Sequence, residues 1–230
     1  MISDIEKLIY KHDSRNHIEI EKKYFVKDEI KVQNIIDVID LMDKYVVNSG
    51  SNKMQIDYYY DTEDYLFKKS NITVRIRESG DSYILTIKTP VIQKVNEKEV
   101  LLNERFEHEY KVNTKDIGLN TDLICKHINK DEIDISNLKE TLIVNNNRTK
   151  YNILEKASSK LMFEMVYDDV KYVNINNSKI ANDKQIEIEM KSDYDYAVNL
   201  KILTDFINKN VPDLEEDVVS KYKRGLELTK

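Results

Sequence analysis

Two stretches near opposite ends of the chain place charged residues at every second position. His17–Val26 reads HIEIEKKYFV and Gln185–Lys191 reads QIEIEMK. Successive side chains of a β-strand point to opposite faces, so the first stretch puts Glu19, Glu21 and Lys23 on one face. The alternation therefore predicts a β-sheet with one apolar face and one charged face.

The same alternation recurs in further segments, and it places charges of both signs on a single face of each strand. These residues are Arg75 and Arg77 in ITVRIR, Lys88 in LTIK, Arg105, Glu107 and Glu109 in ERFEHEY, Glu164 and Asp168 in MFEMVYD, and Glu187 and Glu189 in QIEIEMK. Only six of the 36 basic residues are arginine, yet four of these six lie in predicted strands. A guanidinium is permanently charged and shaped to grip phosphate oxygens, which a merely solvated position does not require.

The charged faces are open to two explanations. If the apolar face is covered by helices and the sheet closes, the charges share one interior, where burial costs several kcal/mol per ion unless the space is wet and the charges compensate. Such a tunnel suits a polyanion held by Arg and Lys, with divalent cations held by Glu and Asp. The alternative is an open sheet whose charged face is simply solvated.

The order of predicted elements favours an α+β fold with a mainly antiparallel sheet, since the strands follow one another as hairpins. We predict a hairpin that turns at Gly80–Asp81 and ends at Pro90. The other predicted strands span about 17–26, 52–62, 100–112, 140–156, 160–173 and 185–191. Predicted helical segments span 1–16 (an irregular lead-in), 29–47, 114–137, 194–210 and 215–230. No linker is visible, so we expect residues 17–230 to form one domain.

Composition excludes several classes of site and narrows the cellular setting. Four dispersed glycines cannot form a glycine-rich phosphate loop, so side chains must hold any phosphate. The single Cys125 excludes an internal disulfide and favours a reducing cytoplasm. No apolar run approaches the ~18 residues that a membrane span needs, and a net charge of −6 argues against general nucleic-acid binding.

The sequence resembles the CYTH proteins, also called triphosphate tunnel metalloenzymes. Glu19 to Lys23 read EIEKK, which matches their ExExK signature. The later features follow in the expected order: YYYDT, RIR at 75–77, TIK at 86–88, RFEHE at 105–109, Arg148, Glu164 with Asp168, EIE at 187–189 and SKYKRGLEL at 220–228. The resemblance covers about residues 17–228 and implies a closed eight-stranded antiparallel barrel with flanking helices, forming a tunnel.

The resemblance also implies roles for the charged residues. Glu19, Glu21, Glu187 and Glu189 would hold Mg²⁺ or Mn²⁺, hard cations that prefer oxygen ligands. The phosphate chain would be bound by Lys23, Arg75, Arg77, Lys88, Arg105 and Arg148, although NNNRTK around Arg148 also suits a simple turn. Lys221 and Arg224 would reach the tunnel mouth, or else lie on a solvated helix end.

The remaining acidic residues keep several possible roles. Glu107, Glu109, Glu164 and Asp168 are candidates for a second metal, for positioning the attacking water, or for holding the arginines. We count them, with Lys23, as candidate catalytic residues. The four histidines are too scattered for a metal triad, and the tyrosines at 58–60 suit core packing, although one ring could face a substrate base.

We expect a metal-dependent hydrolase that acts on phosphoanhydride bonds of a small triphosphate-bearing substrate, as a monomer or homodimer. Inorganic triphosphate is the leading substrate because nothing recognisable in the sequence reads a base or a thiazolium. The alternatives are a class IV adenylyl cyclase and a thiamine triphosphatase, although the chain has no Trp to stack on a thiamine cation. A polyphosphate- or nucleotide-binding module without turnover is the alternative from another class.

Overall fold

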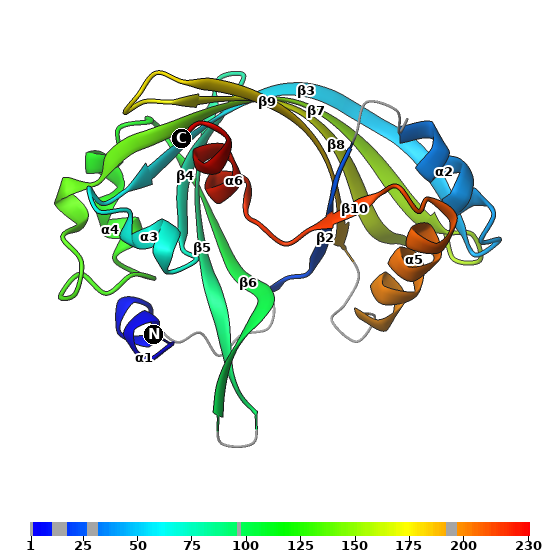
Figure 1. Cartoon of the computed structure of the whole chain (residues 1–230), viewed down its shortest axis with the longest axis horizontal. Coiled ribbons are helices and arrows are strands. Elements are labelled where there is room, and N and C mark those ends of the chain that lie inside the picture. The colour runs from blue at the N-terminus through cyan, green and yellow to red at the C-terminus, as the bar shows by residue number, and fades with distance from the viewer. Residues whose placement is uncertain (1, 11–17, 27–31, 96–97, 192–196) are drawn as a thin grey trace.

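The computed structural model describes residues 2–10, 18–26, 32–95, 98–191 and 197–230. One curled antiparallel sheet dominates this part of the chain, with helices packed against it (Figure 1). Its ten strands are β1 (Ile18–Glu19), β2 (Glu21–Phe25), β3 (Tyr45–Asp61), β4 (Thr73–Ser79), β5 (Ser82–Val95), β6 (Lys98–Val112), β7 (Lys139–Glu155), β8 (Leu161–Asn174), β9 (Ile180–Met190) and β10 (Glu215–Asp217). The α-helices are α1 (Ile2–Leu8), α2 (Val32–Asp40), α3 (Leu66–Lys69), α4 (Thr121–Ile124), α5 (Ala197–Asn210) and α6 (Lys221–Leu228).

The strand order places β1 and β2, which follow one another in the chain, near opposite edges of the sheet. The order is β1-β6-β5-β4-β3-β7-β8-β9-β2-β10, with every pair antiparallel. Only Ile20 separates β1, which pairs with β6, from β2, which pairs with β9. The α+β class and the antiparallel sheet are therefore confirmed. The closed eight-stranded barrel is not confirmed, because the described sheet has ten strands and free ends at β1 and β10.

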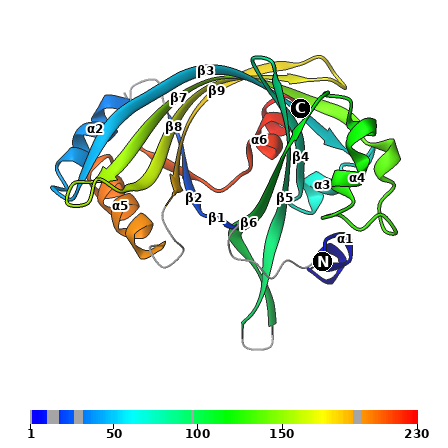
Figure 2. The same cartoon turned by 180° about the vertical axis from the view of Figure 1, so that it is seen from behind.

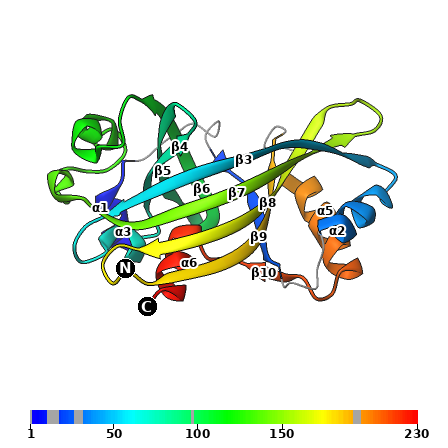
Figure 3. The same cartoon turned by 90° about the horizontal axis from the view of Figure 1, so that it is seen from above.

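Helices cover the convex face of the sheet at its two ends (Figures 1 and 3). One apolar cluster joins Leu8 of α1 and Phe67 of α3 to Ile76 and other residues of β4 and β5. A second joins α2 and α5 to β8 and β9, through residues such as Ile39 and Leu203. The helices therefore cover the apolar face that the strand alternation predicted, on the side of the sheet away from the charges.

Helix α6 packs on the concave side of the sheet (Figures 1 and 2). Its Tyr222 and Leu226 form a third apolar cluster with Leu142 of β7 and Tyr172 of β8. A Cβ atom on Gly225 would lie 2.4 Å from Cδ1 of Tyr172, so only glycine permits this close approach.

Several predicted boundaries are wrong. The helix predicted for 29–47 ends at Asp40, and residues from Tyr45 onward belong to β3; residues 29–31 lie outside the described part. The hairpin turn at Gly80–Asp81 is confirmed, with Gly80 at φ +60°, but β5 continues through Pro90 to Val95. Pro90 is tolerated because the ladder with β6 is irregular directly after it, between Pro90 and Ile92.

Two helical predictions also need correction. The segment 114–137 contains two 3₁₀ turns, Ile117–Asn120 and Ile135–Asn137, and the single-turn α4 in place of longer helices. Residues Glu215–Asp217, predicted as the start of the last helix, pair with β2 as β10. His17, residues 11–16 and residues 194–196, where other predictions fall, lie outside the described part. No helix in the described ranges is long and apolar enough to cross a bilayer.

Candidate functional site

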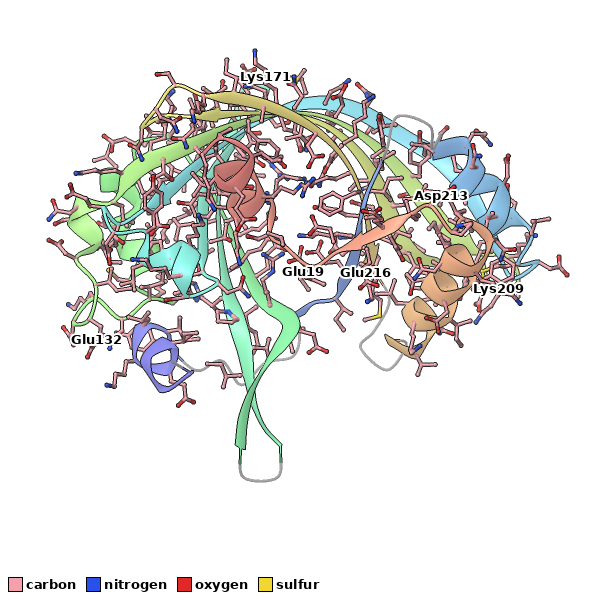
Figure 4. All side chains as sticks on the ribbon, viewed as in Figure 1. Glu19, Glu132, Lys171, Lys209, Asp213 and Glu216 are labelled. Carbon is pink, nitrogen blue, oxygen red and sulfur yellow. The ribbon has the colours of Figure 1, made fainter. Side chains whose placement is uncertain are left out.

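The concave side of the sheet encloses a cavity of about 230 Å³ lined almost entirely by charged and polar side chains. Figure 4 shows side chains from opposite parts of the sheet reaching into this space, with Glu19 at its open side. The lining residues are Glu19, Glu21, Lys23, Tyr59, Thr73, Arg75, Arg77, Lys88, Arg105, Glu107, Glu109, Arg148, Glu164, Glu187, Glu189, Lys191, Ser220, Lys221 and Tyr222. Because the sheet curls, the charged faces of strands that are distant in sequence line the same cavity.

The first two strands contribute carboxylates that are held by basic residues of β5 and β6. Glu19 accepts from Nζ of Lys88 at 2.5 Å and from Nη2 of Arg105 at 3.2 Å. The same Arg105 nitrogen lies 2.8 Å from Oε1 of Glu21, which also pairs with Lys23 at 2.8 Å. Burial alone would raise the pKa of Glu19, but Lys88 and Arg105 outweigh it and lower that pKa, so the carboxylate stays ionised.

A second cluster joins β7, β8, β9 and α6. Arg148 grips Asp168 with two nitrogens, at 2.7 and 2.6 Å, and contacts Oε2 of Glu187 at 2.9 Å. Lys221 of α6 lies 2.5 Å from Asp168 and 3.4 Å from Glu187. Burial disfavours the charge on Glu187, yet Lys221, Lys23 and Arg148 hold its pKa well below the usual range.

Asp57 of β3 anchors the two arginines of β4. Its side chain is fully buried and accepts from Arg77 at 2.7 and 2.9 Å and from Arg75 at 3.3 Å. Burial opposes ionisation of Asp57, but Arg77 and Arg75 hold its pKa far below the ordinary value. A fixed carboxylate behind two guanidinium groups keeps their outer nitrogens aimed at the cavity.

Three glutamates lie in a row across β2, β9 and β8. Glu189 stands directly opposite Glu21 on one side and Glu164 on the other. Burial, with smaller contributions from Glu19 and Glu107, raises the pKa of Glu189 to about 7, despite a Lys191 nitrogen at 2.6 Å. Like charges in directly opposite positions destabilise a sheet, so this row suits a bound cation.

The donor chemistry therefore fits Mg²⁺ or Mn²⁺, but the donors are not gathered around one point. Among the described residues, no three acidic, His or Cys side chains converge closely enough to hold a metal ion. Each of the four predicted metal ligands is instead turned toward a basic neighbour, such as Lys88 for Glu19 and Lys191 for Glu189. The carboxylates would have to exchange these partners to bind a cation.

Residues 17–211 match the CYTH domain family. The chain belongs to this family. Solved structures with a similar fold include a putative adenylate cyclase from Bacillus halodurans, with 20% identity, a TM-score of 0.59, and coverage of 90% of this chain and 97% of that chain. A putative adenylate cyclase from Vibrio parahaemolyticus has 13% identity, a TM-score of 0.54, and coverage of 93% and 99%.

A third similar structure is the PH1819 protein from Pyrococcus horikoshii, with 21% identity, a TM-score of 0.52, and coverage of 91% and 98%. No curated protein matches the chain in sequence. At these identities the solved structures show the shared fold of the CYTH domain.

The structure of this CYTH domain gathers most of the residues that the sequence suggested. Of the sixteen candidates, fourteen line the cavity, and the two that do not are Asp168 and Arg224. Asp168 is fully buried behind Arg148 and Lys221, where it can hold both cations in place. Arg224 lies elsewhere: it pairs with Asp183 at 2.5 Å, and its guanidinium sits 3.5 Å from the ring centre of Phe25.

Sequence reasoning missed several side chains of the site. Asp57 is the most important, and the sign was an acid just before the tyrosine run in IDYYYDT, on the same face as Tyr59. Tyr59 lines the cavity and stacks on Tyr222 with ring centres 5.2 Å apart, whereas the two flanking tyrosines lie in the apolar core. Lys191 follows directly after β9 and lines the cavity, as the alternation already indicated.

Proposed function

We propose that this protein is a divalent-metal-dependent hydrolase of triphosphate phosphoanhydride bonds, with inorganic triphosphate as the leading substrate. The observation that best supports this proposal is one cavity in which basic side chains from five strands and α6 face carboxylates from β1, β2 and β9. Binding of triphosphate substrates and dependence on divalent cations are properties of the CYTH family, and they support the same reading.

The basic groups supply the binding and positioning of the phosphate chain. Arg75 and Arg77 present a fixed pair of guanidinium groups, and Arg105 and Arg148 approach from other strands. Phosphoryl transfer needs charge stabilisation and alignment more than covalent help from the protein. Groups already oriented by Asp57 and Asp168 would provide this without reorganising during the reaction.

Glu19, Glu21, Glu187 and Glu189 are the residues that would hold Mg²⁺ or Mn²⁺. The cation would neutralise phosphate charge and help to activate a water molecule. These carboxylates are now paired with basic residues. Phosphate oxygens can replace the carboxylates as partners of Lys88 and Arg105, so a bound phosphate chain would free the carboxylates to bind the cation. Carboxylates released in this way become available as hard oxygen ligands.

We further propose that segment 18–25 closes the sheet into the eight-stranded barrel that the family resemblance implied. The pairing of β1 with β6 and of β2 with β9, on either side of Ile20, supports this closure. Eight strands then surround the cavity: this segment, β3, β4, β5, β6, β7, β8 and β9.

A reducing cytoplasm is the compartment that the single Cys125 favours.

The test is phosphate release from inorganic triphosphate, ATP and thiamine triphosphate, each with Mg²⁺ or Mn²⁺. Metal-dependent release from triphosphate, lost in a Glu21→Gln variant and kept in the exposed-surface control Glu132→Gln, is the expected result. Cyclic AMP formed from ATP in place of orthophosphate would identify an adenylyl cyclase. Tight binding of all three compounds without any turnover would identify a binding module and contradict the hydrolase.

A further inference from the structure

The first turn of helix α6 carries two neighbouring side chains with different surroundings. Lys221 reaches into the charged cavity, where its ammonium lies 2.5 Å from Asp168 and 3.4 Å from Glu187. The next residue, Tyr222, is 2% exposed and belongs to the apolar cluster between α6 and the sheet. Figure 1 shows that α6 follows soon after the segment that crosses the open side of the sheet at β10. The orientation of this first turn therefore decides where the Lys221 ammonium lies.

The hydroxyl of Tyr222 is held by Asp61, the last residue of β3. Asp61 is fully buried, and its Oδ2 accepts from the Tyr222 hydroxyl at 2.9 Å. The hydroxyl of Thr141 on β7 lies 2.9 Å from the same Tyr222 oxygen. The Tyr222 ring stacks on Tyr59 of the cavity wall, with ring centres 5.2 Å apart and an interplanar angle of 6°. Tyr222 is thus fixed both at its ring and at its oxygen.

The turn after Asp61 holds this carboxylate in place. Its Oδ1 accepts from the backbone N–H groups of Thr62 and Phe67 at 2.8 Å each, and its Oδ2 accepts from that of Lys68 at 3.0 Å. Tyr65 in the same turn has a φ of 59°, a left-handed conformation that residues other than glycine rarely adopt. Such strain persists only where surrounding contacts determine the conformation, and the hydrogen bonds of Asp61 provide such contacts.

Closing this turn does not by itself require a buried carboxylate. Asn or Ser would also cap a short helix, but neither offers two carboxylate oxygens, one for the turn and one shared with α6. Burial raises the pKa of Asp61 more than its hydrogen bonds lower it, so the ionised form is kept at a cost. The hydrogen bond that this carboxylate adds beyond the turn is the one to Tyr222.

We propose that Asp61 and Tyr222 are positioning residues for phosphate binding: their hydrogen bond fixes the first turn of α6, so that the Lys221 ammonium stays in the cavity beside the phosphate chain. The inference rests on the proposed function for the identity of the ligand. Asp61 and Tyr222 act through Lys221 and need no contact with the phosphates. A lysine side chain is long and flexible, so a backbone that is held in advance reduces the entropy lost on binding.

The experiment measures the affinity for diimidotriphosphate, a non-hydrolysable analogue, by titration calorimetry with Mg²⁺. Tyr222→Phe removes the hydroxyl and keeps the stacked ring. Asp61→Asn, the second variant, replaces one carboxylate oxygen by an amide nitrogen. Lys221→Gln removes the ammonium, alone and combined with each of these changes. The matched control is Tyr60→Phe, which removes a buried tyrosine hydroxyl that donates to a backbone carbonyl outside the cavity.

Tyr222→Phe and Asp61→Asn are expected to weaken binding about fivefold or more, and Tyr60→Phe less than about twofold. In the Lys221→Gln background the same two changes should weaken binding by less than about a further twofold, because no ammonium is left to position. A hydroxyl that only stabilises the fold would lower the melting temperature and leave the affinity unchanged. That result, or full weakening by Tyr222→Phe in the Lys221→Gln background, overturns the inference.

Phosphate release by the wild type separates this inference from the proposed function. The expected pattern of affinities without any release from triphosphate supports the positioning role and refutes the hydrolase. Release by the wild type together with an unchanged affinity of Tyr222→Phe refutes only the positioning role. A wild type that neither binds the analogue nor releases phosphate contradicts both proposals.

Discussion

Replacing Glu189 by Gln is expected to stabilise the metal-free protein at alkaline pH and to leave its stability unchanged in acid. Glu189 lies between Glu21 and Glu164 in the cross-strand row, and burial raises its pKa from 4.5 to about 7. As pH rises past 4.5, the unfolded chain loses this proton first, because the folded chain retains it until about pH 7. The free energy of unfolding therefore falls between pH 4.5 and about 7.

The size of this effect follows from the pKa difference. A difference of about 2.5 at about 1.36 kcal/mol per pKa unit corresponds to about 3 kcal/mol above pH 7. The side chain is 29% exposed, so solvent screening reduces the expected gain in the variant to about 1–3 kcal/mol. Glutamine is neutral at every pH and removes the whole pH-dependent contribution.

Urea unfolding followed by circular dichroism, in EDTA at pH 5, 6, 7 and 8, measures this gain. The stability difference between Glu189→Gln and wild type should be smallest at pH 5, just above the unfolded pKa of 4.5, and should grow to its full value at pH 8. Glu132→Gln, on the surface, serves as the control (Figure 4). A variant that is less stable than wild type at pH 8, or whose advantage does not depend on pH, would refute the cost assigned to the ionised glutamate.

Three further changes test other parts of the structure. Asp57→Asn removes the buried partner of two guanidinium groups. It should lower the free energy of unfolding, measured by urea denaturation, by about 3–5 kcal/mol, and a loss below about 1 kcal/mol would contradict the anchoring role. Gly225→Ala places a Cβ 2.4 Å from Tyr172 and should lower the free energy of unfolding by about 1–3 kcal/mol. An unchanged melting temperature would contradict this close packing. Arg148→Lys keeps the charge but not the two-nitrogen contact, and should lower kcat/KM for triphosphate about tenfold or more, whereas Lys171→Ala on the outer surface should not.

Local alternation was enough to predict which face of each strand becomes polar. In ITVRIR the arginines line the cavity and Ile76 lies in an apolar cluster, as a period of two requires. EIE at 187–189 behaves in the same way. This information is local because consecutive side chains of a strand must point to opposite faces, whatever the rest of the chain does.

Element boundaries were less predictable where a distant strand decides the conformation. Tyr45 continues a helical pattern in sequence, yet it pairs with Glu155 in β7. Glu215 pairs with Phe25 although nearly the whole chain separates them. Backbone hydrogen bonds gained in a sheet outweigh a weak local preference for helix, and a sequence window of a dozen residues does not contain the partner.

Alternation along single strands established the charged sheet face, the residue types on it, and the chemistry those types allow. The fold adds the curl that brings these faces around a common space and the placement of Asp57 and Asp168 behind the arginines. It also turns Arg224 toward Asp183. Neither result could be read locally, because a buried ion is tolerable only beside its counter-ion. Those counter-ions come from strands that are distant in sequence and adjacent only in the folded sheet.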